Sequence, residues 1–291
     1  MVMRTRSERM PDAILVQPEA LPEYSVLMAV YRGDMPEWFE EAIESMANQS
    51  LPPREIVVVE DGQLTEGLYD AERRCRECHP ELIRIVTLEQ GKGLAAAMRY
   101  GLQACSCEWI ARMDADDVSD LTRCEEELRM AEAEHADIVG CDCEEFFDSV
   151  QNPAAKRLFP ATHDELVRFS RRRSPFCHPA VMMKKSAILD AGNYRDVHLH
   201  EDYDLFVRML ARGYRGCCVK KILFHSRIGR DYYGRRGGVQ YVRTLLGYNV
   251  QLLRSGWMRP FDFIMRSCGN ILVGLAPVTV RSWFYRRLLR K

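Results

Sequence analysis

The sequence lacks a hydrophobic run long enough to cross a membrane. Its longest apolar run, Ile271–Val280, is about half of the ~20 residues that a span needs, and Pro277 interrupts it. Residues 1–23 mix arginine and glutamate without the apolar stretch of about 7–15 residues typical of an export signal. With 47% apolar and 29% charged residues, and no glycine or proline bias, the composition is that of a globular protein. We therefore expect a cytoplasmic protein.

The eleven cysteines lack the spacing of a disulfide framework or a zinc site. Cys75, Cys78 and His79 spell C-x-x-C-H, the form used for c-type haem attachment. The segment nevertheless has the pattern of a helix end, and no equally spaced second pair exists. In a cytoplasmic chain we expect reduced thiols, most of them small core residues.

Charge is divided unevenly along the chain, although the net charge is only −1. Residues 220–291 contain 15 lysines and arginines against two acids, so an acidic body precedes a basic tail. Such an asymmetry favours a polyanionic partner, either nucleic acid or an anionic membrane surface. An acidic body would repel nucleic acid, which favours the membrane.

Apolar runs alternate with amphipathic segments through the first half of the chain. Strands are predicted at 24–30, 55–60, 83–88 and 109–113, separated by helices that begin near residues 36, 68 and 94. Further on, the pattern predicts helices at 121–135, 166–171, 200–212 and 241–254 and extended segments at 138–147 and 177–184. The fold class is therefore α/β, a doubly wound, mixed and mostly parallel sheet flanked by helices, with a basic helical C-terminal tail.

Acidic residues follow three of the predicted strands, at Asp34, at Asp61, and at Asp114 with Asp116 and the neighbouring Asp117. In such sheets, ligands bind at the carboxyl ends of the strands. Asp114 and Asp116 occupy alternate positions, so both carboxylates can point to one side. Mg²⁺ or Mn²⁺ bridging a diphosphate prefers such oxygen ligands. The alternative is an acidic turn that caps the next helix.

Two further acids each allow two interpretations. Asp61 either caps a turn with Gly62 or accepts hydrogen bonds from the ribose or base of a nucleotide. Glu201 and Asp202 open the predicted helix 200–212, where free N–H groups and the helix dipole stabilise an ionised carboxylate. That position suits a catalytic base, although acids also cap helices for structural reasons alone.

Taken together, these features resemble the inverting family 2 glycosyltransferases, which have the GT-A nucleotide-sugar fold. The similarity covers roughly Tyr24 to Gly238 and is closest to bacterial members that build capsular or exopolysaccharide repeat units. Seven ordered blocks carry it: SVLMAVYRGD, EIVVVEDG, EQGKGLAAAMRYGL, WIARMDADD, HPAVMMKKSAILDAGNY, HEDYDLFVRMLARGY and RRGG. The resemblance implies an N-terminal extension (1–23), a glycosyltransferase domain (24–240) and the basic tail (241–291).

The resemblance also implies a role for each matched position. The donor would be a nucleotide sugar, with UDP favoured, and the acceptor a saccharide or lipid-linked saccharide. Asp202 would be the catalytic base, Asp114 and Asp116 would hold the diphosphate through Mn²⁺ or Mg²⁺, and no nucleic acid would take part. The remaining positions are Ala29, Tyr31, Asp61 and Lys92 for the nucleotide, and His178, Pro179, Glu201 and Arg236 near the sugar or acceptor.

The sequence departs from the family pattern at two points. Glu60 stands where the second strand more often has the first of two aspartates. Many relatives have a histidine after the last core strand that reaches the metal, but the matching residues 226–229 contain none, and His225 comes a few positions early. The third metal ligand is therefore left open.

Three alternatives remain at the level of sequence. A sugar nucleotidyltransferase would need a glycine-rich, arginine-containing loop after the first strand, whereas residues 31–34 contain only Gly33 as glycine. A non-catalytic nucleotide-sugar binding protein would keep the fold without turnover. For the tail, arginines interleaved with Trp257, Phe261 and Phe263 are typical of a membrane-surface segment at the inner face of the membrane. A tail that packs on the body and offsets its acidity is the other interpretation.

Overall fold

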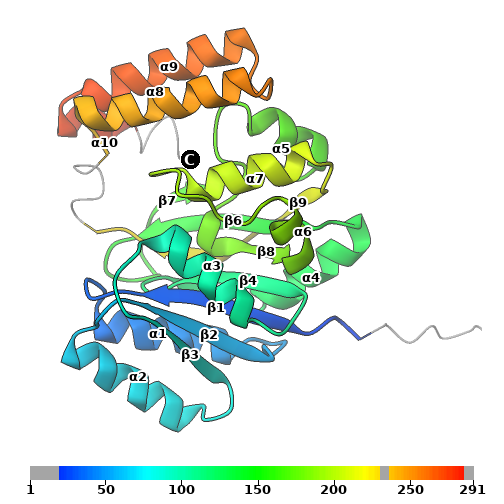
Figure 1. Ribbon diagram of the computed structural model, residues 1–291, viewed down its shortest axis with the longest axis vertical. Coiled ribbons are helices and arrows are strands. Elements are labelled where there is room, and N and C mark those ends of the chain that lie inside the picture. Colours follow the sequence, from blue (N-terminus) through cyan, green and yellow to red (C-terminus); the bar gives the residue numbers. More distant parts are fainter. Residues whose placement is uncertain (1–19, 230–235, 285–291) are drawn as a thin grey trace, which may run out of the picture.

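One mixed β-sheet runs through the protein and is flanked by helices (Figure 1). The computed structural model describes residues 20–229 and 236–284. The strand order is β3-β2-β1-β4-β8-β6-β9-β5, and β7 pairs with the later part of β6, beyond the residues that pair with β8. Four pairings are parallel and four are antiparallel, so the prediction of a mixed sheet is confirmed.

The first half of the chain is a parallel βαβ array, as predicted. β1 and β2 are buried on both faces, which explains their apolar runs, whereas the edge strand β3 is partly exposed. β1 lies between β2 and β4, so the carboxyl ends of these three strands are neighbours. The elements are β1 (Tyr24–Val30), α1 (Pro36–Ala47), β2 (Glu55–Asp61), α2 (Glu66–Cys78), β3 (Ile83–Leu88), α3 (Leu94–Ala104) and β4 (Trp109–Asp114).

The second half adds antiparallel strands to the other edge of β4. β8 pairs antiparallel with both β4 and β6, and β6 pairs in parallel with β9. The two-residue β5 and the largely exposed β7 were not predicted, because neither has an alternating apolar pattern. β9 was also not predicted, because Lys220 and Lys221 interrupt its apolar residues. The elements are β5 (Val118–Ser119), α4 (Arg123–Glu134), β6 (Ile138–Phe146), β7 (Pro153–Arg157), α5 (His163–Phe169), the 3₁₀ turn η1 (His178–Ala180), β8 (Val181–Lys184), α6 (Lys185–Asp190), α7 (Glu201–Ala211) and β9 (Gly216–Arg227).

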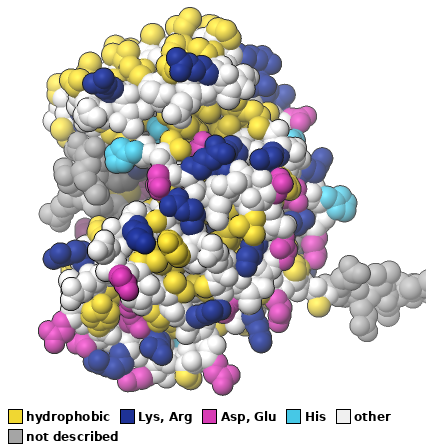
Figure 2. Space-filling view, in the orientation of Figure 1, with side chains coloured by type: hydrophobic (Ala, Val, Ile, Leu, Met, Phe, Trp, Pro, Cys, Tyr) yellow, Lys and Arg dark blue, Asp and Glu magenta, His cyan; other side chains and the backbone are white. Residues whose placement is uncertain are grey.

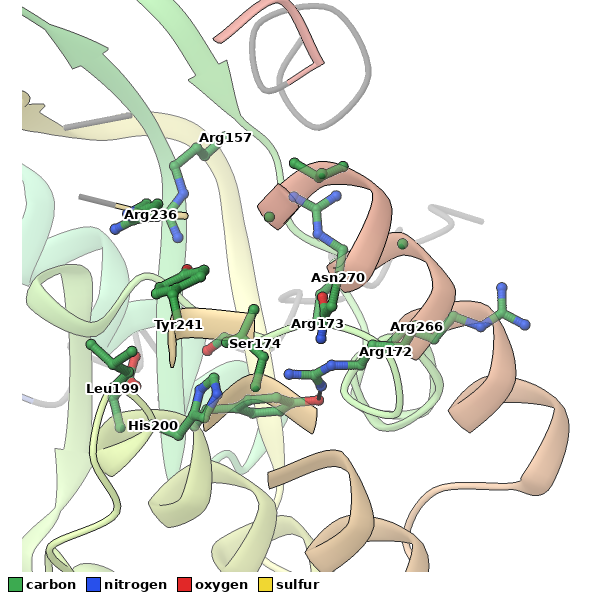
Figure 3. Close-up of a pocket in the computed structure, with 16 residues that line it drawn as sticks. Arg157, Arg172, Arg173, Ser174, Leu199, His200, Arg236, Tyr241, Arg266 and Asn270 are labelled. Carbon is green, nitrogen blue, oxygen red and sulfur yellow. Dashed lines mark hydrogen bonds between the residues drawn. The ribbon is translucent and has the colours of Figure 1, made fainter. Parts of the chain in front are cut away.

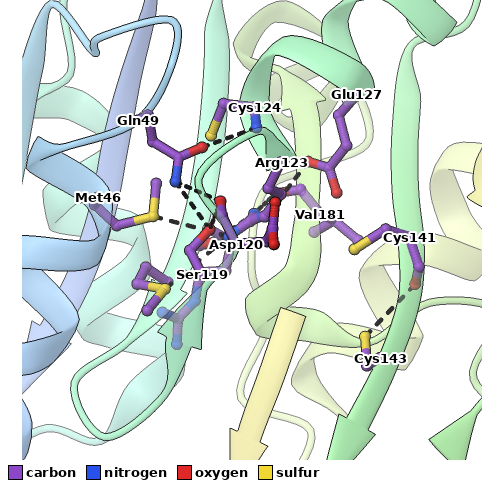
Figure 4. Close-up of polar contacts among 12 residues, drawn as sticks. Met46, Gln49, Ser119, Asp120, Arg123, Cys124, Glu127, Cys141, Cys143 and Val181 are labelled. Carbon is purple, nitrogen blue, oxygen red and sulfur yellow. Dashed lines mark hydrogen bonds and ion pairs between the residues drawn. The ribbon is translucent and has the colours of Figure 1, made fainter. Parts of the chain in front are cut away.

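A buried polar cluster fixes the loop that follows β4 (Figure 4). The guanidinium of Arg123, fully buried at the start of α4, donates to the carbonyl of Arg112 on β4 (2.9 Å) and pairs with Glu127 (3.4 Å). Just after α1, the side-chain amide of Gln49 donates to the carbonyl of Asp120 (2.7 Å) and accepts from the backbone N–H of Cys124 (3.0 Å). The chain after β4 is thus tied to two helices.

The C-terminal residues form a helical pair above α7 (Figure 1): α8 (Val239–Arg254) and α9 (Pro260–Leu275), followed by α10 (Val278–Phe284). A small hydrophobic cluster joins them to α7, made of Tyr203, Val207, Tyr248, Leu252 and Met258. Trp257 packs beside it and its indole N–H donates to the Ser170 hydroxyl (3.1 Å). The inner side of the tail therefore packs on the body, as the second interpretation of the tail expected.

The structure also locates the basic residues counted from the sequence. Lys220, Lys221 and Arg227 belong to β9 of the body and form ion pairs there. Arg281 is buried and donates to the carbonyls that end α9. These four of the fifteen basic residues of 220–291 are therefore paired with groups of the fold. In the described ranges, no helix has both the length and the apolar character required to cross a membrane.

All eleven cysteines are free thiols, and eight of them are buried, as expected. The C-x-x-C-H segment is the end of α2, with His79 as its C-terminal cap. His79 Nε2 lies 2.8 Å from Glu44 Oε1. The segment is therefore a structural helix end.

Candidate functional site

Three carboxylates meet where β4 ends. Asp114 is the last residue of β4, and Asp116 and Asp117 lie in the turn that follows. One ligand oxygen of each lies within 4.8 Å of the others, which makes this the one group of carboxylates, histidines or cysteines in the described ranges that could hold a metal ion. Ala29, on the neighbouring strand β1, is in register with Asp114. The structure thus brings together three of the predicted positions, Ala29, Asp114 and Asp116.

Two arginines hold this acidic cluster in place. Arg112, only 1% exposed, forms an ion pair with Asp114 two residues further along β4. Arg227, at the end of β9, donates from its backbone N–H to Asp117 (2.7 Å) and from Nε to the carbonyl of Asp116 (2.8 Å). Its guanidinium stacks against Trp38 and Phe146. The carboxylates are therefore pre-positioned by buried, charge-assisted contacts.

Like charges crowd this edge of the sheet. Burial, and then the charge of Asp114, raises the pKa of Asp116 to about 6. Burial also raises the pKa of Asp34 to about 7, and the charges of Asp116 and Asp114 add to that effect. A divalent cation would relieve this repulsion, and hard oxygen ligands suit Mg²⁺ or Mn²⁺. The residues present therefore fit a divalent metal.

The third position in this cluster belongs to a carboxylate. His225 lies on β9 opposite Val118, and its Nδ1 lies 3.0 Å from Glu144 Oε1, so it is already engaged. Residue 227, within the stretch where many relatives have a metal-binding histidine, is the arginine that contacts Asp116 and Asp117. Asp117 is the third carboxylate of the group, and the sequence suggested it only as a neighbour.

The predicted nucleotide residues lie at the ends of β1 and β2. Both oxygens of Asp61 accept backbone N–H groups, from Lys92 (2.7 Å) and Gly93 (2.9 Å), which ties the loop before α3 to the end of β2. Gly62 has a φ of +84°, and a side chain there would collide with the backbone of Gly91, so this approach requires glycine. Tyr31 is 51% exposed at the same edge. Their roles in nucleotide binding remain predictions.

Asp202 is the second residue of α7 and lines a pocket of about 720 Å³ (Figure 3). Burial, and then the neighbouring charge of Glu201, raises the pKa of Asp202 to about 6, while the N–H of Tyr203 and the charge of Arg157 act in the opposite direction. A half-buried carboxylate with a pKa just below neutrality suits a general base. The catalytic role of Asp202 remains a prediction.

The residues predicted near the sugar or acceptor divide into two groups. Arg236 lines the same pocket as Asp202. His178 is buried, with Nε2 3.0 Å from the Tyr194 hydroxyl, and burial together with the charge of Arg112 holds its pKa well below the usual value. His178 and the buried Pro179 therefore lie in the core beneath the site.

Sequence reasoning indicated Arg236 but missed the other arginines of this site. Arg112 precedes Asp114 by two positions on a strand, and this spacing could have indicated that the two side chains meet. Arg157 could not have been found this way, because β7 itself was not predicted.

Residues 25–191 match the model of the family described as Glycosyl transferase family 2, and the chain belongs to this family of enzymes. It is a glycosyltransferase with a GT-A-like fold. Among its relatives is the Escherichia coli UDP-Gal:alpha-D-GlcNAc-diphosphoundecaprenol beta-1,3-galactosyltransferase, 32% identical over 93% of this chain and 98% of that protein. The amylovoran biosynthesis glycosyltransferase AmsE of Erwinia amylovora is 31% identical over 91% of this chain and 98% of its own length.

Solved structures show the same fold at lower identity. The mannosyltransferase PcManGT of Pyrobaculum calidifontis, in complex with GDP-Man and Mn²⁺, matches with a TM-score of 0.64 and 19% identity, over 86% of this chain and 69% of its own. S. aureus TarS residues 1–349, in complex with UDP-GlcNAc, matches with a TM-score of 0.59 and 16% identity, over 79% of this chain and 66% of its own. At these identities the likeness concerns the fold alone.

Proposed function

We propose that this protein is a metal-dependent inverting glycosyltransferase that moves a sugar from a UDP-sugar to a lipid-linked saccharide during polysaccharide assembly. The observation that carries this proposal is the cluster of Asp114, Asp116 and Asp117 at the strand ends, which suits a cation bridging a diphosphate. Two relatives covering nearly the whole chain support it, one named for a UDP-sugar and a diphosphoundecaprenol acceptor and one for an exopolysaccharide.

In this mechanism, Asp202 accepts the proton of an acceptor hydroxyl whose oxygen attacks the anomeric carbon of the donor sugar. Attack occurs on the face opposite the diphosphate, so the bond to UDP breaks and the configuration inverts. Asp114 and Asp116 would hold Mn²⁺ or Mg²⁺, which supplies charge stabilisation to the departing diphosphate. Arg112 pairs with the carboxylate of Asp114, and Arg227 holds the backbone carbonyl of Asp116 and the carboxylate of Asp117.

A screen of nucleotide sugars for metal-dependent release of UDP tests the proposal. We expect slow hydrolysis of one UDP-sugar that requires Mn²⁺ or Mg²⁺ and stops with a chelator. Release of pyrophosphate from UTP and a sugar phosphate would instead indicate a nucleotidyltransferase. Tight binding of UDP-sugars without any release, even with lipid-linked acceptors present, would indicate a non-catalytic binding protein.

A lipid-linked acceptor requires a protein that reaches the membrane surface, and α9 has a suitable outer face. Apolar side chains at helical spacing are exposed along it, with Phe261 at 65% and Leu272 at 72% exposure. Figure 2 shows hydrophobic side chains gathered over the helical pair, with basic side chains beside them. The stripe consists of Phe261, Ile264, Met265, Leu272 and Leu275. We propose that it rests in the interface of the anionic inner leaflet.

We expect the double variant Phe261→Ser/Leu272→Ser to lose most of its binding to vesicles that contain phosphatidylglycerol, because it removes the two most exposed members of the stripe. Co-sedimentation of the full-length chain measures this at low and high salt. Leu121→Ser is the matched control, since Leu121 is 58% exposed on the body. Equal pelleting of the double variant and the wild type would exclude the stripe as the membrane contact and favour a soluble acceptor.

A further inference from the structure

The pocket that contains Asp202 is lined by more arginines than the proposed chemistry uses. It lies between the start of α7, the end of β7, the residues after α5 and the inner faces of α8 and α9. Its five arginines are Arg157, Arg172, Arg173, Arg236 and Arg266, and Asp202 is its single carboxylate. These arginines come from four separate segments of a chain whose net charge is −1.

The arginines surround the pocket from two sides (Figure 3). Arg157 and Arg236 lie on one side near Tyr241, and Arg172, Arg173 and Arg266 lie on the other side with Asn270. Arg266 donates to the Tyr203 hydroxyl (2.5 Å) and lies over that ring, which fixes its guanidinium at the pocket wall. Arg172 pairs with Asp262 on α9 (2.6 Å).

Among the residues that line the pocket, arginines outnumber carboxylates by five to one. His200 is neutral at physiological pH, since burial, and then the charges of Arg266 and His198, lowers its pKa to about 3. It stacks on Tyr248, with ring centroids 4.4 Å apart. The charge of Arg157 acts directly on Asp202, whose pKa it lowers. The base and the arginines therefore share one electrostatic environment.

We propose that this pocket binds the diphosphate of the acceptor, so that the sugar attached to that diphosphate reaches Asp202 with its reacting hydroxyl. The inference rests on the proposed function and adds to it a second anion site, separate from the acidic cluster that serves the donor. Guanidinium groups bind phosphate oxygens in pairs of parallel hydrogen bonds, which suits them to a diphosphate. A volume of about 720 Å³ accommodates a small ligand of this size.

One side of α9 faces the pocket and the opposite side is exposed and apolar, an arrangement that suits a lipid-linked acceptor. Arg266, Asn270 and Val273 face the pocket at helical spacing. Phe261, Ile264, Leu272 and the rest of the apolar stripe are exposed to solvent. A diphosphate held by Arg266 would therefore leave its hydrocarbon chain beside the face that we place in the membrane.

The test is calorimetric titration of the full-length protein with inorganic pyrophosphate in EDTA, which removes any contribution of a metal. We expect measurable binding to the wild type, and binding at least about 10-fold weaker to Arg157→Gln/Arg266→Gln, because one arginine is lost from each side. Arg129→Gln is the matched control: Arg129 is 58% exposed on α4 and pairs with Glu125. Its pyrophosphate affinity should equal that of the wild type.

Competition separates a diphosphate from other phosphate sources. We expect a short-chain prenyl diphosphate to displace pyrophosphate more effectively than the corresponding monophosphate or vesicles of phosphatidylglycerol. Equal displacement by the vesicles would overturn the assignment in favour of a lipid headgroup, and equal displacement by the monophosphate would overturn a site for diphosphate. Wild-type affinity for pyrophosphate in the double arginine variant would also overturn it.

Failure of this inference is distinguishable from failure of the proposed function. Affinity for UDP with Mn²⁺ should be retained in the double arginine variant, which shows that it is folded. If UDP release proceeds normally while the arginine variant binds pyrophosphate like the wild type, only the pocket assignment is wrong. Loss of pyrophosphate binding in that variant, in a protein that releases no UDP, would support the anion site and refute the donor chemistry.

Discussion

Asp202→Asn is expected to lower the rate of sugar transfer by about 10²–10⁴, the range for loss of a general base. The amide keeps the size and hydrogen-bonding shape of the side chain at the start of α7 but cannot accept a proton. Affinity for the UDP-sugar should stay near that of the wild type, because the metal and nucleotide positions lie at the strand ends. Single-turnover transfer and calorimetry with UDP measure the two quantities separately.

Glu201→Gln is the matched control for this substitution. Glu201 adjoins Asp202 and raises its pKa through charge, but the proposal gives it no proton to carry. We expect a small change in rate for Glu201→Gln. Full turnover in Asp202→Asn together with a large loss in Glu201→Gln would reverse the two roles.

The pH dependence provides an independent test of the same assignment. The base must be ionised, so kcat/KM should rise as pH increases through about 6 and level off above it, since the pKa of Asp202 is raised to about 6. Glu201→Gln removes a charge that raises this pKa, so the rise should move to lower pH. Asp202→Asn should lose this acidic limb. If the acidic limb of the kcat/KM profile is unchanged in Asp202→Asn, the limb reports the titration of another group.

The parallel half of the sheet could be predicted because its central strands are buried on both faces. A short apolar run between turn residues, such as residues 26–30 in β1 or 56–59 in β2, has few other structural solutions. The predicted strands end within one residue of those observed. The acids at their ends could be placed at one edge for the same reason, since β2, β1 and β4 are adjacent and parallel.

The arginine pocket could not be predicted, because no local pattern carries it. Arg157 lies on the exposed strand β7, in which Pro153 is the only residue typical of a turn. Arg266 lies more than 100 residues later in the chain, on α9. Their meeting depends on how the helical pair packs over α7. Charge counting detected the basic tail, but a count cannot separate Arg266, which lines a pocket, from Arg281, which is buried against the end of α9.

The acidic cluster illustrates both outcomes. The alternation of Asp114 and Asp116 after a strand pointed to a metal site, and the structure places their oxygens together with that of Asp117. The two arginines that hold them were not foreseen. Arg112 is buried in a strand, where an apolar residue is the usual occupant, and Arg227 arrives from β9 across more than 100 residues of chain.

Asp116→Ala is expected to abolish metal-dependent UDP binding and to lower transfer by about 10³-fold or more, since a catalytic metal supplies several kcal/mol of charge stabilisation. The fold should tolerate the change, because Arg227 contacts the backbone carbonyl of Asp116, which alanine retains. Calorimetry with UDP in the presence of Mn²⁺ measures the loss. Asp120→Asn is the control, because it removes a charge of the same sign in the same loop. The carboxylate of Asp120 accepts hydrogen bonds from Thr122.

The same titration in EDTA separates a metal site from a structural turn. Without a metal, Asp116 repels the diphosphate, so Asp116→Ala should bind UDP as well as the wild type or better. In Mn²⁺ the order should reverse, because the carboxylate then attracts the ion that neutralises the diphosphate. Equal affinity of the wild type and the variant under both conditions would mean that Asp114 and Asp116 form only an acidic turn before α4. If the wild type binds UDP more tightly than Asp116→Ala in Mn²⁺ but not in EDTA, a cation must lie between the carboxylates and the nucleotide.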